Sequence, residues 1–126
     1  MRVLLDTAVV IYAVESPEKL SRRAASALRN LDNALELSAL SVTEIAIKAA
    51  WGKLEFPVAV LRKAVDDLGI RILPYTSDHA FRLFELPVHH RDPFDRQIIA
   101  QALSEDMAII TPDREFGSYH GLKLIW

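Results

Sequence analysis

Acidic residues stand at places where an apolar pattern of the sequence begins or ends, and together they could bind a metal ion. They are Asp6, Glu44, Asp92, Asp95 and Asp113. Carboxylates that gather in one place repel one another and raise each other's pKa unless a cation compensates. Mg²⁺ or Mn²⁺ prefers oxygen ligands, so a carboxylate pocket suits it better than zinc. One or two such ions can bridge carboxylates and a phosphate and activate a water for in-line attack. These residue types therefore point to phosphodiester hydrolysis.

The elements that must position these acids alternate between strands and helices. Apolar runs predict strands, and apolar residues at helical spacing, with Pro or Gly at the ends, predict helices. Strands are expected at residues 2–5, 35–40, 70–75, 107–111 and 122–126, and helices at 16–31, 41–51, 57–69, 77–86 and 92–106. Strands separated by helices imply right-handed crossovers. The sequence thus predicts one α/β domain over residues 1–126, with a mostly parallel sheet of four to five strands covered on both faces.

This fold would gather four of the acids at one edge of the sheet. Asp6 follows the first strand and Asp113 follows the strand at 107–111, so both lie beyond the carboxyl ends of parallel strands. The amino ends of the crossover helices lie at the same edge, which brings in Glu44 and Asp95. Sheets of this kind bind ligands at this edge, where the strand order reverses.

Each acid also has a purely structural interpretation. Asp6 and Asp113 could be helix caps or ordinary strand-end residues, because aspartate is common at such places. The order Ser41-Val-Thr-Glu44 matches a capping box, which by itself accounts for a glutamate there. Capping explains these acids one at a time. It does not explain why four of them should meet at one edge of one sheet.

The stretch "HRDPFDRQIIAQAL" begins a helix with two aspartates three residues apart. Asp92 at the N-cap, Pro93 at the first helical position and Asp95 in the first turn satisfy the preferences of a helix start and its macrodipole. We therefore expect Asp92 to begin the helix and Asp95 to face the metal ion.

The composition excludes several other kinds of site. The 126 residues contain no cysteine, which removes disulfides and cysteine-ligated metals and favours a reducing, cytoplasmic setting. No apolar run approaches the roughly 20 residues of a membrane span, and "MRVLLDT" reaches an aspartate too early for a signal peptide. Fifteen basic against 17 acidic residues give a net charge of -2. A nucleic-acid partner would therefore need a local basic patch or a bound metal.

Four stretches of the chain also carry a resemblance to a known family. They are "VLLDT", "SVTEIAIKAAWGKL", "HHRDPFDRQIIAQAL" and "ITPDREFGSYHGLKLIW". In order and spacing the chain resembles PIN-domain ribonucleases, and most closely the VapC-type toxins of toxin–antitoxin pairs. The resemblance implies a three-layer α/β/α domain with a Mg²⁺- or Mn²⁺-dependent endoribonuclease site. It also implies a homodimer that can assemble further with a small cognate antitoxin, which inserts a basic or bulky side chain into the acidic pocket.

The resemblance carries the family's four acids onto Asp6, Glu44, Asp95 and Asp113 as catalytic and metal-binding residues. Asp6 and Asp95 would hold the principal ion. The other two acids would complete its shell, form a second metal site or hold the attacking water. Asp92 falls one turn before the family's third acid. It is therefore expected to be the N-cap of the helix or to have an outer-shell role.

Three further positions bear on the match. Thr111, two residues before Asp113, matches a small hydroxyl residue of the family that could orient a water; a strand-end threonine of high β-propensity is the alternative. Ala8 is apolar where many relatives carry a polar residue, and Thr43 stands where close relatives often have tryptophan. Neither departure removes a metal ligand.

Basic side chains near the acids are the candidates for contact with an RNA substrate. They are Lys48, Lys53, Arg91, Arg96 and Arg114, of which Arg96 and Arg114 are adjacent to predicted ligands. A solvated surface charge is the alternative for each. The histidines, His79, His89, His90 and His120, lack the i, i+4 spacing of metal ligands on a helix, and the reaction requires no histidine base.

Other functional classes fit less well. A haloacid-dehalogenase-type phosphatase needs a second aspartate two residues after the first, where Ala8 stands, and a receiver domain needs an aspartate ending its third strand, where residues 70–75 supply none. The remaining alternative is a catalytically inactive PIN-like module that binds RNA or a protein partner. Retention of all four acids argues against it.

Overall fold

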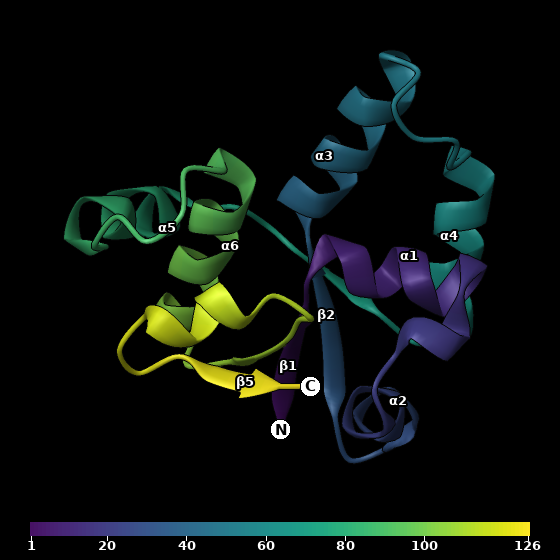
Figure 1. Ribbon diagram of the computed structural model, residues 1–126, viewed down its shortest axis with the longest axis horizontal. Helices are drawn as coiled ribbons and strands as arrows, with labels where there is room; N and C mark the ends of the chain where they lie inside the picture. Colours follow the sequence, from purple (N-terminus) through teal and green to yellow (C-terminus); the bar gives the residue numbers. More distant parts are fainter.

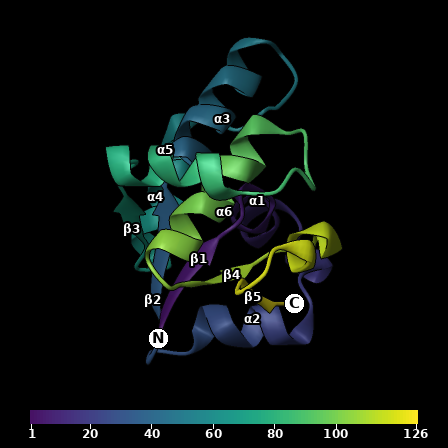
Figure 2. The ribbon, with the colours of Figure 1, turned by 90° about the vertical axis from the view of Figure 1, so that its left-hand side faces the viewer.

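Five strands form one fully parallel sheet in the computed structural model, which describes all 126 residues. They are β1 (Arg2–Leu5), β2 (Ala34–Ser38), β3 (Arg71–Leu73), β4 (Ala108–Ile110) and β5 (Lys123–Ile125). Their order is β3-β2-β1-β4-β5, so the chain first builds outward from β1 on one side and then returns to build on the other (Figures 1 and 2). The strand order therefore reverses between β1 and β4, and a ligand site is expected beyond their carboxyl ends.

Six helices cover the sheet and confirm the expected α/β/α architecture. They are α1 (Thr7–Glu15), α2 (Arg22–Arg29), α3 (Ala39–Ala50), α4 (Val58–Asp67), α5 (Ser77–Arg82) and α6 (Pro93–Ser104), with 3₁₀ turns η1 (Pro17–Lys19), η2 (Leu83–Glu85) and η3 (Arg114–Ser118). Figure 1 shows α1, α2 and α4 on one side of the sheet and α5 and α6 on the other. In Figure 2, α3 lies at the end of the molecule opposite the N-terminus and α2.

The hydrophobic core is divided by the sheet because side chains alternate along each strand. Val3 and Leu5 face the core beneath α1 to α4, and Leu4 between them faces the core beneath α6. All three side chains are fully buried. A strand buried on both faces reads as a continuous apolar run, which is why "RVLL" is a reliable strand signal. No helix is both long and apolar enough to cross a membrane.

One helix was not predicted, and one local prediction is wrong. Residues Thr7–Glu15 form α1, a helix that was not predicted because its β-branched run Val9-Val10-Ile11 lacks a polar face. Helix α3 begins at Ala39 rather than Ser41, and its N-cap is Ser38, whose Oγ accepts from the Leu40 N–H. The Ser41–Glu44 capping box therefore does not exist, and capping does not account for Glu44.

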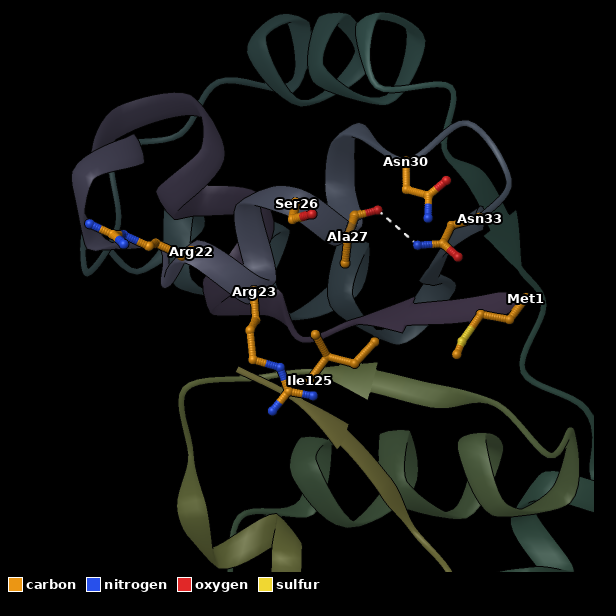
Figure 3. Close-up of a pocket in the computed structure, with 8 residues that line it drawn as sticks. All are labelled: Met1, Arg22, Arg23, Ser26, Ala27, Asn30, Asn33 and Ile125. Carbon is orange, nitrogen blue, oxygen red and sulfur yellow. Dashed lines mark hydrogen bonds between the residues drawn. The ribbon is translucent and has the colours of Figure 1, made fainter.

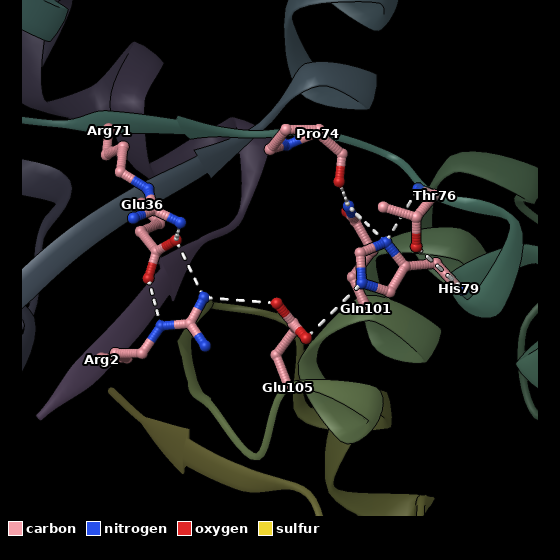
Figure 4. Close-up of polar contacts among 8 residues, drawn as sticks. All are labelled: Arg2, Glu36, Arg71, Pro74, Thr76, His79, Gln101 and Glu105. Atoms are coloured by element: carbon pink, nitrogen blue, oxygen red, sulfur yellow. Dashed lines mark hydrogen bonds and ion pairs between the residues drawn. The ribbon is translucent and has the colours of Figure 1, made fainter.

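A buried carboxylate in the middle of β2 is held by charges from its two neighbouring strands (Figure 4). Glu36 is 2% exposed. Arg2 donates to both of its oxygens, at 2.7 Å from Nε and 3.0 Å from Nη2. The Arg71 guanidinium lies 3.6 Å from Oε1 and is largely exposed. Arg2 is thus the principal partner that compensates the buried charge.

Replacing Arg2 by Met is expected to lower the free energy of unfolding by about 2 kcal/mol, because a buried carboxylate loses two charge-assisted hydrogen bonds. Replacing Arg71 by Met should cost less than about 1 kcal/mol, since that pair is long and solvent-screened. Urea denaturation of both variants measures the difference. Equal losses would show that the Arg2–Glu36 ion pair contributes no more to stability than the exposed Arg71–Glu36 pair.

Candidate metal centre

Asp6 lies at the point where the strand order reverses, directly after β1. Its backbone N–H donates to the carbonyl of Ile110 at 3.0 Å, which ties it to the end of β4. It occupies the N-cap position of α1, but its side chain makes no capping hydrogen bond. Instead Oδ2 accepts from the hydroxyl of Thr111 at 2.7 Å. Burial raises the pKa of Asp6, the charge of Glu44 raises it further, and the Thr111 hydrogen bond opposes both effects.

Glu44 points from α3 toward the same region and is 6% exposed. Its Oε1 accepts from the hydroxyl of Thr7 at 2.7 Å, and that hydroxyl lies 2.8 Å from the hydroxyl of Ser41. Its Oε2 pairs with Nζ of Lys48 at 2.7 Å, one turn further along the helix. Both oxygens of Glu44 are therefore engaged by the protein itself, and Ser41 serves this hydroxyl pair rather than a helix cap.

Asp92 caps α6, as expected, and Asp95 stands in the first turn of the same helix. The carboxylate of Asp92 accepts from the N–H groups of Phe94 at 2.8 Å and Asp95 at 3.3 Å, which makes Asp92 the N-cap of α6. The carboxyl group of Asp95 forms no hydrogen bond and no ion pair within the protein.

The pKa of Asp95 reflects its burial and the charges of the other acids. It is raised to about 7, first by burial and then by the negative charges of the other acids, Asp92, Asp6, Glu44 and Asp113. Coulombic repulsion falls with distance. Acids from four separate elements are therefore close enough to Asp95 for their charges to raise its pKa. The charges of all four acids thus reach the Asp95 carboxyl group.

Asp113 completes the group and brings a histidine with it. It is the N-cap of η3, where Oδ1 accepts from the Glu115 N–H at 2.9 Å, and its own N–H donates to Thr111 Oγ1 at 3.0 Å. Oδ2 lies 3.2 Å from Nε2 of His90. This contact joins residues 23 apart on separate elements, so spacing along one helix could not reveal a role for His90.

Thr111 is an uncharged residue that contacts two of the acids. It is 2% exposed, and its hydroxyl donates to Asp6 while accepting from the backbone of Asp113. One side chain thereby fixes the two acids on either side of the β1–β4 junction. A threonine present only for its β-propensity would not need these contacts to two acids.

The Thr111→Val variant should lose about 1.5–3 kcal/mol of unfolding free energy, because the buried Asp6 carboxylate loses its hydrogen-bond donor. Thr111→Ser keeps the hydroxyl and should recover most of the loss. Chemical denaturation in the presence of a chelator measures both. A valine variant as stable as the wild type would show that the hydroxyl does not support Asp6.

The donor set fits a hard divalent cation. No three of the four acids bring their oxygens within 4.8 Å of one another; the group that does is His90, Asp113 and Glu115. A cation at the acids would therefore be held directly by one or two carboxylates with water completing its shell, which is the usual mode for Mg²⁺. The raised pKa values of Asp6 and Asp95 are the mark of carboxylates that lack a compensating positive charge.

The basic residues near the acids fall into two classes. Lys48 is paired with Glu44, and the charges of Asp92 and Asp95 also contribute to raising its pKa. Arg96 donates to the carbonyl of Pro87 at 2.8 Å and so anchors the loop before α6. The side chains of Arg91 and Arg114 are exposed and form no hydrogen bond or ion pair within the protein. These last two are free to meet a substrate.

A hollow of about 480 Å³ elsewhere on the molecule does not compete with this site. It is bounded by α2, by the segments before β1 and β2, and by β5 (Figure 3). Its lining residues are Met1, Arg22, Arg23, Ser26, Ala27, Asn30, Asn33 and Ile125. It contains no carboxylate and no histidine, so it offers none of the side chains that a metal-dependent reaction needs.

Known proteins match nearly the whole chain. The sequence model of the PIN domain matches residues 3–122, a range that includes all four acids. Ribonuclease VapC22 of Mycobacterium tuberculosis is 30% identical over 120 residues, which cover 93% of this chain and 91% of that protein.

Solved structures share the fold. VapBC2 from Rickettsia felis, bound to a DNA fragment from its promoter, aligns with a TM-score of 0.75 at 18% identity, covering 98% of this chain and 97% of that chain. VapBC-1 from nontypeable Haemophilus influenzae aligns with a TM-score of 0.71 at 21% identity, covering 98% and 96%. FitAcB from Neisseria gonorrhoeae aligns with a TM-score of 0.67 at 21% identity, covering 97% and 95%.

Proposed function

The chain belongs to the PIN-domain family and resembles its VapC-type members, and on that premise we propose that it is a metal-dependent endoribonuclease, the toxin of a VapBC-type toxin–antitoxin pair. Residues 1–126 would form a single PIN domain. The observation that carries the proposal is the Asp95 carboxyl group, which has no partner and whose pKa is raised to about 7 by burial and by four other acids. A divalent cation bound to this carboxyl group would supply the positive charge that compensates these acids.

The four acids would share the work unequally. Asp6 and Asp95 would hold the principal ion, because Asp95 is unpaired and Asp6 has one oxygen free of side-chain hydrogen bonds. Glu44, with both oxygens engaged, suits an outer position that orients a water. Asp113 would complete the shell or support a second ion. When bound, Mg²⁺ or Mn²⁺ would neutralise the scissile phosphate and lower the pKa of a coordinated water.

Protons and substrate would be handled by the remaining groups. Asp95 would release its proton as the cation binds, because the cation replaces the proton as the compensating charge. Arg91 and Arg114, which are exposed and unpaired, would contact the RNA backbone. Arg96 and Lys48, which are committed to Pro87 and Glu44, would support the site instead.

A protein partner is the second part of the proposal. The solved structures that share this fold include VapBC2 and VapBC-1, and a small cognate antitoxin would neutralise this chain. Large apolar side chains stand exposed on α5, η2 and the loop that follows: Phe81 is 69%, Phe84 89% and Val88 76% exposed. Exposed apolar groups of this size mark contact surfaces. They support a homodimer that could assemble further with the antitoxin.

Cleavage of structured RNA tests the enzymatic proposal. The wild type should cleave bulk tRNA and rRNA with Mg²⁺ or Mn²⁺ and stop when EDTA is added, and Asp6→Asn should be inactive. Asp32→Asn, an exposed acid outside the site, is the matched control and should retain full activity. Cleavage that persists in EDTA, or equal cleavage by Asp6→Asn, would overturn the proposal. RNA binding without any cleavage would favour the inactive binding module.

A further inference from the structure

His90 is a buried histidine that the mechanism above leaves unused. It stands three residues before the start of α6 and is 6% exposed. Its ring lies between two parts of the molecule: Nδ1 is 3.1 Å from the hydroxyl of Tyr119, and Nε2 is 3.2 Å from Oδ2 of Asp113. The backbone N–H of His90 also donates to the Tyr119 hydroxyl, at 3.1 Å. Burial and contacts at both ring nitrogens indicate that the orientation of the His90 ring has a specific role.

Hydrogen-bond accounting assigns the proton on the ring. The Tyr119 hydroxyl oxygen accepts from the His90 backbone, so its single hydrogen remains to be donated. Within this cluster, the acceptor available to it is Nδ1 of His90. If Nδ1 carried the proton instead, the hydroxyl hydrogen of the buried Tyr119 would have no partner, which costs about 1–3 kcal/mol. The neutral ring therefore carries its proton on Nε2, which donates to Asp113.

Aromatic packing fixes the direction of this donor. The rings of His90 and Tyr119 are stacked, with centroids 5.5 Å apart and planes at 14°. The edge of the Phe116 ring meets His90 at 5.0 Å and 82°. Both aromatic residues are almost fully buried. The imidazole consequently has no freedom to turn its Nε2–H away from Asp113.

Asp113 needs such support because its own surroundings are open. Its side chain is 38% exposed, and it stands at the start of a short 3₁₀ turn. The Glu115 N–H fixes Oδ1, and His90 fixes Oδ2. With one donor on each oxygen, the plane of the carboxylate is set, and each oxygen keeps a lone pair for another ligand.

We propose that His90 is a positioning residue for Asp113: Tyr119 sets the Nε2–H form of its ring, and Nε2–H holds the carboxylate of Asp113 in the orientation that metal binding uses. The inference deepens the proposed function and rests on the role assigned there to Asp113. It also explains the cluster of His90, Asp113 and Glu115, in which the histidine donates a hydrogen bond to the carboxylate and is not itself a metal ligand.

The tautomer can be measured directly on the metal-free wild type. Long-range ¹H–¹⁵N NMR of the histidine rings at pH 8 should show His90 with a protonated Nε2 and an unprotonated Nδ1, and addition of Mg²⁺ should leave that proton in place. A proton on Nδ1 would overturn the inference. So would loss of the Nε2 proton on adding Mg²⁺, because His90 would then be a ligand.

Metal binding tests the consequence. By Mn²⁺ electron paramagnetic resonance, His90→Phe, which keeps a stacked ring but has no donor, should bind Mn²⁺ about tenfold more weakly than the wild type, the usual loss for an outer-shell partner. His90→Gln, whose amide N–H can reach the same carboxylate, should recover most of the affinity. His89→Phe is the control, because His89 is exposed and meets the same Tyr119 ring by its edge.

The outcomes separate the two proposals. A wild type that binds no Mn²⁺ would overturn the proposed function. A wild type that binds Mn²⁺ together with a folded His90→Phe of equal affinity would overturn the role of His90 alone. Thermal unfolding of each variant verifies that it is folded before its affinity is compared.

Discussion

The Asp95→Asn protein is expected to lose RNA cleavage by two to three orders of magnitude, about the effect of removing several kcal/mol of metal-supplied transition-state stabilisation. The same change should make the metal-free protein more stable at neutral pH. Asparagine has nearly the same shape and carries no charge, so it relieves the repulsion that raises the pKa of Asp95 to about 7. Initial cleavage rates and urea denaturation in EDTA measure the two effects.

Asp92→Ala is the matched variant, three residues earlier on the same helix start. Its carboxylate caps α6, so its loss should cost about 1 kcal/mol of unfolding free energy. Cleavage should stay within about tenfold of the wild type, because the change leaves the Asp95 carboxylate in place. If Asp92→Ala abolished cleavage in a folded protein while Asp95→Asn retained it, the two aspartates would have been assigned in the wrong order.

Stability of the metal-free protein should fall as the pH rises from about 4 to about 7. The folded-state pKa of Asp95, about 7, lies above the value of about 4 expected for an unfolded chain. In this interval the folded protein therefore binds more protons than the unfolded protein, and deprotonation costs stability. Because the side chain is partly exposed, solvent screening should limit the loss to about 1–2 kcal/mol. The buried Asp6, whose pKa is also raised, contributes with the same sign.

Divalent metal should reverse this loss, and it should do so mainly at high pH. At pH 8 a concentration of Mn²⁺ about a hundredfold above its dissociation constant adds about 2.7 kcal/mol, which corresponds to a rise in Tm of roughly 8–15 °C for a chain of this size. At pH 5 protons compete for the same oxygens and the rise should be much smaller. Differential scanning calorimetry at the two pH values, with EDTA as the reference, measures both. An equal rise at both pH values, or an unchanged response in Asp95→Asn, would contradict binding at this carboxylate.

Much of the architecture could be predicted from the sequence because parallel strands buried on both faces leave a strong pattern. The run "RVLL" and the Pro57 and Gly69 boundaries of α4 are local signals with local causes. Helix α1 escaped prediction because Val9 and Val10 pack against the sheet. There the tertiary environment overrides the weak helical preference of β-branched residues.

The acids of the site could be located from topology, but their individual surroundings could not. Placing Asp6 and Asp113 beyond the ends of β1 and β4 needs only the strand order. The link of both acids to Thr111, and the contact of His90 with Asp113, depend on side-chain directions that no spacing encodes. The supposed capping box at Ser41 shows the opposite failure: a local motif matched by chance, because α3 had already begun at Ala39.

The central claim is that the convergent acids hold the catalytic metal, and the anomalous scattering of Mn²⁺ in a soaked crystal at pH 8 tests it most directly. We expect a peak bonded to carboxylate oxygens of Asp6 and Asp95, with Asp113 and Glu44 in its first or outer shell, and no peak in Asp95→Asn. A peak held by His90, Asp113 and Glu115 away from Asp6 and Asp95, or no peak at all, would contradict the account.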